Sequence, residues 1–326
     1  MKKISKFIVL FVVSFIITSL LIAFYFKGAI LITFDIVKDL KDSNKSVATL
    51  SELTNYYCST SMDVSRLRYK ESLSDDVFLD IYKSNITDKP SPVVIYVHGG
   101  SWIYGDNGIP IGLDPIVNAF NKRGFNIISV SYELLKEDTP ISNPVSDVKD
   151  AIRWVYKNKD EYNFDTNNIG LLGISSGAHL SLLSAYSSED EFIGDKKLAN
   201  YPSKVNYIID IFGPTELSTL DFSVADDEFK DEIEKLKGKS FLGDIYSPIN
   251  YVDDSSPSTL IIHSKNDELV PYKNSVDLYN KLKEEDVNSK LLSLNSGGHN
   301  FYGFDNKEIA ALIFEVFKFL IKNTSL

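Results

Sequence analysis

Short apolar runs alternate with amphipathic segments from about residue 56 to residue 326. The runs that predict buried strands occupy residues 93–97, 126–132, 168–173, 205–212, 258–264 and 290–295. Between them, apolar residues at helical spacing predict helices over residues 114–123, 144–159, 176–186, 272–285 and 306–322. Strands that alternate with helices are typical of an α/β domain, in which a mainly parallel sheet carries helices on both faces.

Two parts of this predicted domain, residues 56–326, do not follow the alternation. Residues 65–72 and 77–84 flank a Ser-Asp-Asp turn and predict an antiparallel hairpin at the sheet edge, for a total of about eight strands. Residues 218–240 are acidic and helix-prone, and they follow a strand. We expect this insertion to be either a cap over a site at the sheet edge or a solvated surface helix.

The amino-terminal pattern differs from the rest of the chain. Residues 7–26, "FIVLFVVSFIITSLLIAFYF", form a run of 20 residues without a charge, and three lysines precede it. A helix of that length spans roughly 30 Å, the thickness of the bilayer hydrocarbon core. The run therefore predicts a single transmembrane helix, with residues 1–27 as a membrane anchor and residues 28–55 as a juxtamembrane connector. In the connector, "ILITFDIVKDL" (30–40) predicts a short amphipathic helix.

Cleavage of this segment as a secretory signal is the alternative. A signal peptide has a shorter apolar run followed by a small-x-small site. The best such site here ends at Ala29 and has Lys27 at the position that should be small. We therefore expect an uncleaved anchor. Because basic flanks stay in the cytoplasm, the domain is expected on the extracytoplasmic side, and a secreted form remains the alternative.

Charge and cysteine content exclude several classes of function. The net charge of −11 argues against nucleic acid as a partner, since a phosphate backbone is bound by a basic face. Cys58 is the only cysteine, which excludes an internal disulfide framework and a cysteine-based zinc site. No cofactor and no metal are implied by the sequence.

The segment "GISSGAHL" (173–180) contains Gly-x-Ser-x-Gly with Ser175 at its centre. The pattern alone is weak, but here it closes a predicted strand and opens a predicted helix. A serine at such a strand–turn–helix apex is the nucleophile elbow of serine hydrolases. The flanking glycines leave room for a sharp turn whose side chains would otherwise collide with the neighbouring strand and helix.

The base that activates Ser175 is found by elimination among four histidines. His98 belongs to a glycine motif, His179 lies on the helix after Ser175, and His263 ends a predicted strand. His299 follows a Gly-rich loop after the last strand, where an imidazole can swing over the serine. We therefore predict His299 as the general base and His179 as structural support.

The third expected member is a carboxylate that orients the base. In hydrolases with a nucleophile elbow it lies between the serine and the histidine in the chain, just after a strand. Asp267 in "IIHSKNDELVP" meets both conditions. The alternative for Asp267 is a helix cap, but "ELVP" is too long a spacer for that.

The segment "YVHGGSW" (96–102) predicts an oxyanion hole. Because Gly99 and Gly100 have no side chains, their backbone N–H groups can approach a developing alkoxide closely. The N–H of Ser176, the residue after the nucleophile, is the expected second donor. Trp102 is expected either to line the substrate cleft or to pack in the core.

Taken together, these motifs resemble the α/β-hydrolase superfamily, specifically the esterase branch with an HGGxW oxyanion motif. The resemblance covers about residues 70–326 and includes "HGGSWIYGD" (98–106), "DTNNIGLLGISSGAHL" (165–180) and "HSKNDELVP" (263–271). Ser101 replaces the third oxyanion glycine of the lipase-like pattern, and Ser176 replaces the usual alanine. These departures favour the carboxylesterases and sugar-deacylating esterases, with kynurenine formamidase-like enzymes as further relatives.

The function that this resemblance implies is a serine carboxylesterase that cleaves a small acyl ester, including an acetylated carbohydrate, through an acyl-enzyme. An amidase, formamidase or peptidase of the same fold is the alternative among enzymes. A non-catalytic adhesion protein of this fold is the alternative from another class, although such proteins usually lose a triad member. The expected partners are an ester substrate and, through the anchor, the membrane.

Overall fold

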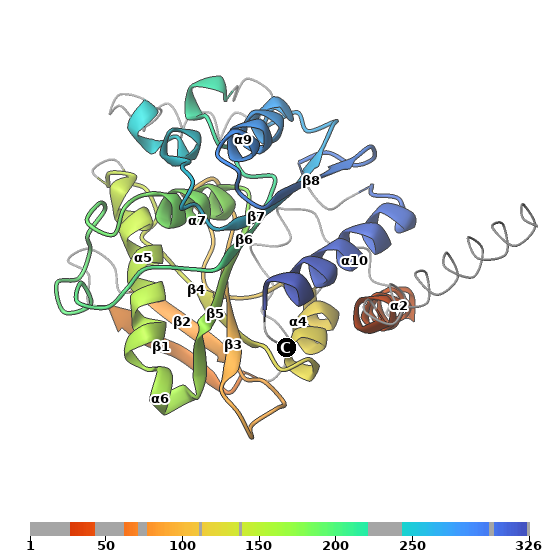
Figure 1. Ribbon diagram of the computed structural model, residues 1–326, viewed down its shortest axis with the longest axis horizontal. Coiled ribbons are helices and arrows are strands. Elements are labelled where there is room, and N and C mark those ends of the chain that lie inside the picture. The colour runs from red at the N-terminus through yellow and green to blue at the C-terminus, as the bar shows by residue number, and fades with distance from the viewer. Residues whose placement is uncertain are drawn as a thin grey trace, which may run out of the picture.

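Eight strands form one mainly parallel sheet in the described part of the chain (Figure 1). The computed structural model describes residues 27–42, 62–70, 77–110, 113–136, 139–220, 243–299 and 303–324. The sheet consists of β1 (Val64–Lys70), β2 (Val77–Tyr82), β3 (Ser91–Val97), β4 (Asn126–Val130), β5 (Phe164–Ile174), β6 (Tyr207–Ile211), β7 (Ser258–Ser264) and β8 (Ser289–Leu294). The predicted strands all occur within it.

The strand order is β1-β2-β4-β3-β5-β6-β7-β8. β1 and β2 pair antiparallel, as predicted for the hairpin, and β2 pairs antiparallel with β4. The six strands from β4 to β8 in this order are parallel. Their carboxyl ends therefore share one edge of the sheet, and the loops that follow β3, β5 and β7 meet there.

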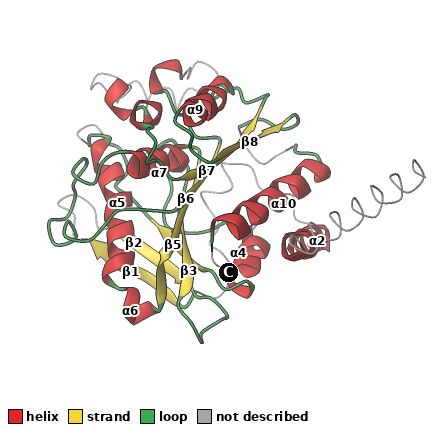
Figure 2. Ribbon diagram, viewed as in Figure 1, coloured by secondary structure: helices red, strands yellow, loops and turns green. Residues whose placement is uncertain are grey.

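Helices cover both faces of the sheet (Figure 2). The α-helices are α2 (Lys27–Asp42), α4 (Asp114–Lys122), α5 (Ser142–Lys157), α6 (Lys159–Tyr162), α7 (Ser176–Tyr186), α9 (Lys273–Glu284) and α10 (Asn306–Asn323). Three short 3-10 helices complete the described elements: η2 (Leu217–Thr219), η4 (Asp244–Tyr246) and η5 (Pro248–Tyr251).

Alternating side chains of the central strands pack into two separate hydrophobic cores, one on each face of the sheet. In β3, Val93, Ile95 and Val97 pack with α5, α7 and α9, whereas Val94 and Tyr96 pack with α4 and α10. Because successive side chains of a strand point to opposite faces, a strand buried on both sides has to be apolar throughout. This is the physical origin of the continuous apolar runs in the sequence.

β5 differs most from its prediction, since it begins at Phe164 rather than at residue 168. Asn163 adopts a left-handed conformation with φ of 56°, and this conformation ends α6. The chain then turns directly into the sheet, where Phe164 pairs with Ser91. Asparagine tolerates this conformation better than most residues do.

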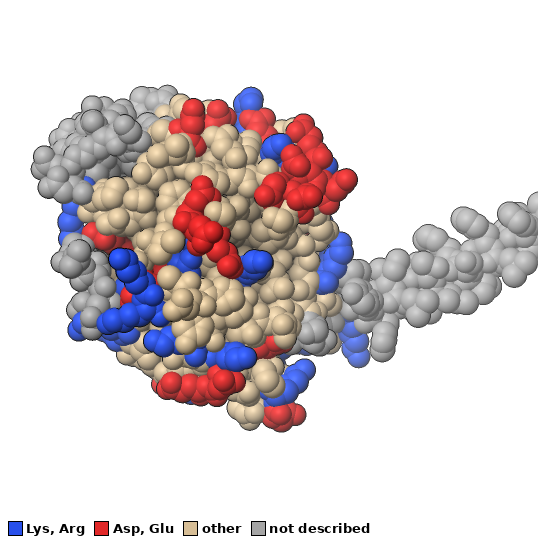
Figure 3. Space-filling model, turned by 60° about the vertical axis from the view of Figure 1, so that its left-hand side comes forward, with Lys and Arg blue, Asp and Glu red and all other residues tan. Residues whose placement is uncertain are grey.

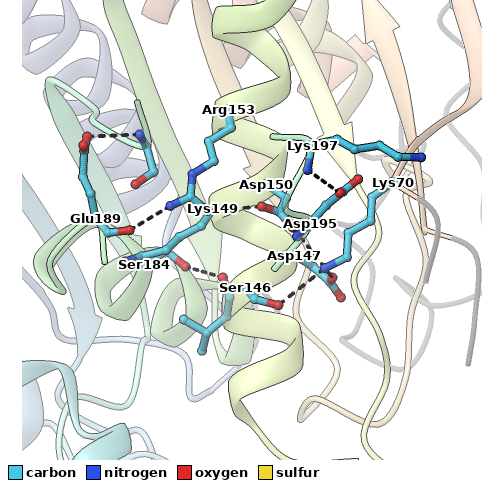
Figure 4. Close-up of polar contacts among 12 residues, drawn as sticks. Lys70, Ser146, Asp147, Lys149, Asp150, Arg153, Ser184, Glu189, Asp195 and Lys197 are labelled. Atoms are coloured by element: carbon cyan, nitrogen blue, oxygen red, sulfur yellow. Dashed lines mark hydrogen bonds and ion pairs between the residues drawn. The ribbon is translucent and has the colours of Figure 1, made fainter. Parts of the chain in front are cut away.

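Buried charges hold β1 against α5 (Figure 4). The Nζ atom of Lys70 lies 2.5 Å from Asp147 Oδ1 and 3.1 Å from Asp150 Oδ2, and both aspartates are on α5. Asp150 Oδ2 also accepts a hydrogen bond of 2.7 Å from the amide of Asp195. The edge strand and the segment after α7 are thus tied to one helix.

Three predictions fall on residues outside the described part of the chain. These are residues 1–26 of the membrane anchor, the part of the connector beyond Asp42, and residues 221–240 of the predicted cap. The connector residues up to Asp42 belong to α2, where an amphipathic helix was expected. Within the described ranges, no helix combines the length and the apolar character needed to cross a bilayer.

The surface carries charges of both signs. Figure 3 shows acidic and basic side chains side by side on one face, with acidic groups forming the larger patches of its upper half. This mixture agrees with the net charge of −11 of the whole chain.

Candidate active site

Ser175 lies at the turn between β5 and α7, at the carboxyl edge of the sheet. Its backbone has φ of 54° and ψ of −122°, a strained conformation for a residue with a side chain. The Ser175 amide donates a hydrogen bond of 2.8 Å to the carbonyl oxygen of Ile211 in the neighbouring strand. The sheet therefore holds this strained turn in place.

The two glycines around Ser175 are required by close packing. A Cβ atom on Gly173 would lie 2.4 Å from Cα of Ala178 in α7. A Cβ atom on Gly177 would lie 2.2 Å from the carbonyl oxygen of Val97 at the end of β3. Because real Cβ atoms do not approach so closely, a larger residue at either position would displace the serine.

The structure brings Ser175, His299 and Asp267 together. The Oγ atom of Ser175 lies 2.8 Å from Nε2 of His299, and Nδ1 of His299 lies 2.7 Å from Oδ2 of Asp267. Ser175 and His299 are 124 positions apart in the sequence, and His299 and Asp267 are 32 positions apart. Three loops at the same edge of the sheet thus contribute to one chain of hydrogen bonds. In this arrangement the imidazole can accept the serine proton while the carboxylate stabilises the resulting cation.

The loop that carries His299 is fixed at its base. Glu308, in the first turn of α10, accepts hydrogen bonds from the amides of Asn295 and Ser296 at 2.6 and 3.0 Å. The hydroxyl of Ser264, at the end of β7, donates to the carbonyl oxygen of Gly297 at 2.8 Å. These contacts let the short Gly-rich loop hold an imidazole at a defined height above Ser175.

Asp267 is held by its own backbone turn. Its Oδ1 atom accepts hydrogen bonds from the amides of Leu269 at 3.0 Å and Val270 at 2.8 Å. Burial by itself would raise the pKa of Asp267, but hydrogen bonds from His263 and His299 outweigh burial and hold the pKa well below its ordinary value. The carboxylate is therefore ionised at neutral pH.

His263 is a contact of Asp267 that the sequence interpretation missed. Its Nε2 atom lies 3.0 Å from Asp267 Oδ2 and 3.1 Å from the carbonyl oxygen of Val270, and its Nδ1 atom lies 2.6 Å from the hydroxyl of Ser275. Since both neighbours of Nε2 are acceptors, we assign the proton to Nε2. The only sequence signal was a histidine four residues before the acid at a strand end.

Gly99 lies directly beside the serine. A Cβ atom on Gly99 would lie 3.4 Å from Cβ of Ser175 and 3.0 Å from the carbonyl oxygen of Ile174. Gly100 has φ of 124°, and a Cβ atom there would lie 2.2 Å from the carbonyl oxygen of Tyr104. Gly100 therefore has to be a glycine, whereas a side chain at Gly99 would be tightly packed against the turn at Ser175.

The amides of Gly99, Gly100 and Ser176 are available to a ligand. Within the described ranges, none of these three N–H groups donates a hydrogen bond to the protein. Ser176 is the first residue of α7, so its amide also lies at the positive end of a helix dipole. The positions suit donors that stabilise negative charge on an oxygen bound next to Ser175.

His98 supports this loop rather than acting as a base. Its ring stacks on Tyr132 at a centroid distance of 4.2 Å, and Nδ1 lies 2.7 Å from the carbonyl oxygen of Gly99. Burial lowers the pKa of His98 to about 4, so the ring is neutral at physiological pH. Nδ1 then donates its proton to Gly99 and holds the shape of the glycine turn.

Trp102 packs in the core, which is one of the two alternatives left open by the sequence. Its side chain is 2% exposed, and Nε1 donates a hydrogen bond of 3.1 Å to Nδ1 of His179. His179 Nε2 donates in turn to the carbonyl oxygen of Tyr246 at 2.7 Å. Burial lowers the pKa of His179 to about 4, so this pair is neutral and links the glycine loop after β3 to α7 and η4.

Comparisons with known proteins find similarity to esterases. Esterase LipC of Mycobacterium tuberculosis (strain ATCC 25618 / H37Rv) is 26% identical over 232 residues, which cover 68% of this chain and 56% of LipC. The probable isoprenylcysteine alpha-carbonyl methylesterase ICME of Oryza sativa subsp. japonica is 26% identical over 230 residues, which cover 66% of this chain and 53% of that protein. The chain thus spans about half the length of these curated relatives.

Solved esterase structures share the fold. A butyrate-bound esterase from Thermogutta terrifontis superposes with a TM-score of 0.65 at 22% identity, covering 79% of this chain and 93% of its own. A truncated carbohydrate esterase from gut microbiota superposes with a TM-score of 0.63 at 26% identity. The superposition covers 85% of this chain and 100% of that chain. These similarities confirm the predicted α/β-hydrolase fold and the resemblance to its esterases.

A family model settles the membership more directly. The BD-FAE model matches residues 79–282, a stretch that runs from β2 to α9 and contains Ser175 and Asp267. This match covers more than half of the 326 residues. The chain therefore belongs to the BD-FAE family.

Proposed function

We propose that the protein is a serine carboxylesterase. The observation that carries the proposal is the hydrogen-bonded chain from Ser175 through His299 to Asp267. Similarity to esterases over most of the domain supports the same reaction class. A serine hydroxyl is a poor nucleophile by itself, and a neighbouring imidazole oriented by a carboxylate is the usual means of activating it.

In the proposed reaction, Ser175 Oγ attacks the ester carbonyl carbon while His299 Nε2 takes the hydroxyl proton. The carbonyl oxygen becomes an oxyanion that accepts hydrogen bonds from the amides of Gly99, Gly100 and Ser176. Collapse of this intermediate breaks the bond to the alcohol, which leaves with the proton from His299. Water, deprotonated by the same imidazole, then attacks the acyl-enzyme and releases the acid and free Ser175.

We infer a small acyl ester as the substrate, with an acetylated carbohydrate as the favoured class. The support is the similarity to a carbohydrate esterase from gut microbiota, at 26% identity over 85% of this chain. The departures from the lipase-like motif at Ser101 and Ser176 point the same way. Amides and formamides remain the competing substrates, because the triad itself does not distinguish leaving groups.

We further propose that residues 1–27 anchor the enzyme in a membrane with the α/β domain on the extracytoplasmic side. The uncharged run of 20 residues and the preceding lysines support this orientation. A cleaved, secreted form is the alternative, and a mature chain that begins near residue 30 would identify it.

Labelling with a fluorophosphonate probe tests the proposed nucleophile. The wild-type chain is expected to react, and Ser175→Ala is expected to lose labelling and to lower kcat/KM for a short-chain nitrophenyl ester by at least about 10³-fold. Ser176→Ala removes the adjacent hydroxyl but keeps the backbone amide, so labelling should persist. An unreactive wild type, or equal labelling of Ser175→Ala, would contradict the proposal. Acetylated sugars and N-formyl amides, assayed side by side, then identify the substrate class.

A further inference from the structure

Helix α2 exposes an apolar face to solvent. Phe34 is 69% exposed, Ile30 48% and Leu31 47%. Seven large hydrophobic side chains are exposed within the described ranges, and three of them lie within five residues of one another on this helix. Scattered apolar residues at a surface are ordinary, whereas a contiguous group marks an interaction site.

Two lysines lie on the same face. At about 100° of rotation per residue, Lys27, Ile30, Leu31, Phe34 and Lys38 fall within an arc of about 100° on α2. Both lysine side chains are exposed. The face therefore consists of three apolar side chains in its middle and a cationic side chain at each end. We call these five residues the α2 stripe.

The opposite side of α2 is attached to the domain. Ile36 is 1% exposed and packs in the same core as Phe317 and Leu320 of α10 and Phe120 of α4. Contacts of α2 with both of these helices agree with this packing. Because α2 is fixed in this way, the stripe faces outward and is not free to turn into the protein.

The geometry points to the surface of a lipid bilayer as the partner of the α2 stripe. This inference rests on the proposed anchor, since the uncharged run of residues 7–26 ends immediately before Lys27. A helix that follows a membrane segment lies close to the bilayer surface. An apolar face flanked by lysines is the pattern of helices that lie in the interface, where lysines reach the lipid phosphates.

The net charge of −11 does not conflict with this contact. A charge-driven association of the whole domain with anionic lipid would be opposed by that charge. The α2 stripe instead buries apolar side chains and presents only its own two lysines to phosphates. Since α2 packs on α10, and α10 follows the loop of His299, the contact would set the orientation of the proposed active site relative to the bilayer.

Site-specific fluorescence of the full-length chain tests this inference. Cys58→Ser removes the only native cysteine. In that background, Phe34→Cys introduces a single cysteine, whose thiol is labelled with the environment-sensitive fluorophore NBD. The matched control is Ile245→Cys, because Ile245 is also exposed, at 62%, but lies on η4 beside η2. Both proteins are reconstituted in phosphatidylcholine–phosphatidylglycerol vesicles, with or without doxyl-labelled lipid, and their activity on a soluble ester checks the fold.

The expected result is that the label at position 34 is quenched strongly by doxyl lipid and weakly by aqueous iodide, with the reverse at position 245. A chain that floats with the vesicles but is quenched only by iodide at position 34 would overturn the inference while leaving the anchor intact. Disulfide-linked dimers of unlabelled Phe34→Cys without lipid quenching would show that a second copy covers the stripe, and would also overturn it. A chain that does not float would refute both the anchor and the bilayer contact, whereas the proposed esterase activity is measured separately.

Discussion

Asp267 receives more hydrogen bonds than the proposed base alone supplies. Two backbone amides bind Oδ1, and His263 and His299 both lie within hydrogen-bond distance of Oδ2. His263 is itself held by the hydroxyl of Ser275. A carboxylate with so many donors is fixed in position and stays ionised, and both properties are needed to orient an imidazole.

Replacing His263 is therefore expected to weaken the proposed catalysis without removing any proposed catalytic group. His263→Ala removes one charge-assisted hydrogen bond, of about 1.5–3 kcal/mol, and should lower kcat/KM roughly 10- to 100-fold. Asp267 then has one hydrogen-bond donor fewer, so its negative charge should stabilise the protonated imidazole of His299 more strongly. The acid limb of the pH profile of kcat/KM should therefore move to higher pH. Steady-state kinetics between pH 5 and 9 measure both effects.

His263→Gln is the matched variant, because its amide can replace the Nε2 donor and should restore part of the activity. Asp267→Asn should lower activity by more, about 10⁴-fold, since the base then loses its carboxylate. If His263→Ala has the wild-type pH profile and rate, the contact with Asp267 has no role in positioning.

At the scale of secondary-structure elements, α5 combines a core-facing apolar side with buried charges. Its Asp147 and Asp150 bind Lys70 of the edge strand, and all three side chains are at most 10% exposed. Burial by itself would lower the pKa of Lys70, but the two aspartates outweigh it and raise that pKa. Lys70 is therefore charged, and it neutralises carboxylates that would otherwise be costly to bury.

Lys70→Met should consequently destabilise the fold. It keeps an unbranched side chain but leaves Asp147 without its cation and Asp150 with Arg153 alone, at 3.2 Å. Breaking a buried ion pair in this way costs about 3–5 kcal/mol. Lys273→Met is the control, because the ion pair of Lys273 with Asp277 lies at the surface and should change stability by less than about 1 kcal/mol. Urea unfolding of the full chain in detergent compares the two. Equal stabilities would show that the buried network contributes no more than a surface pair.

At the scale of the whole molecule, several buried groups couple folding to pH, among them His98, His179 and Asp210. Burial lowers the pKa of His98 and of His179 to about 4, against ordinary values near 6.5. Burial also raises the pKa of Asp210 to about 7, although the amide of Gly213 donates to one of its oxygens. At these three groups, unfolding between about pH 4 and 6.5 thus binds two protons at the histidines and releases one from Asp210, a net uptake of 2 − 1 = 1 proton.

The contribution of these three groups to the free energy of unfolding should therefore fall by about 1.4 kcal/mol for each pH unit between about pH 6.5 and 4. Above pH 6.5 the histidines no longer contribute, and the deprotonation of Asp210 should reduce stability slightly. Asp210→Asn keeps this side chain neutral at every pH, so its stability should fall about twice as steeply on acidification and should not decline above pH 7. Urea unfolding at pH 5, 6, 7 and 8 measures the slopes, and a wild-type stability independent of pH would contradict this account.

Much of the fold could be predicted because it follows from local periodicity. Central strands such as β3 are apolar on both faces, so their runs stand out from the helical spacing around them. The beginning of β5 could not be predicted in this way, since it depends on the left-handed turn at Asn163 and on pairing with Ser91. Helix α2 was expected as an amphipathic segment, but which of its faces is exposed depends on α10 and α4.

The candidate site also has features that could be predicted from the sequence and features that could not. The sequence by itself determined the glycines around Ser175, because steric limits at a strand–turn–helix junction act between chain neighbours. It also determined which histidine and aspartate follow the last strands of the sheet. Only the tertiary structure decided that His263 contacts Asp267, that Trp102 lies buried against His179, and that His98 is neutral. Those properties depend on burial and on partners distant in the chain, and no local pattern of residues specifies them.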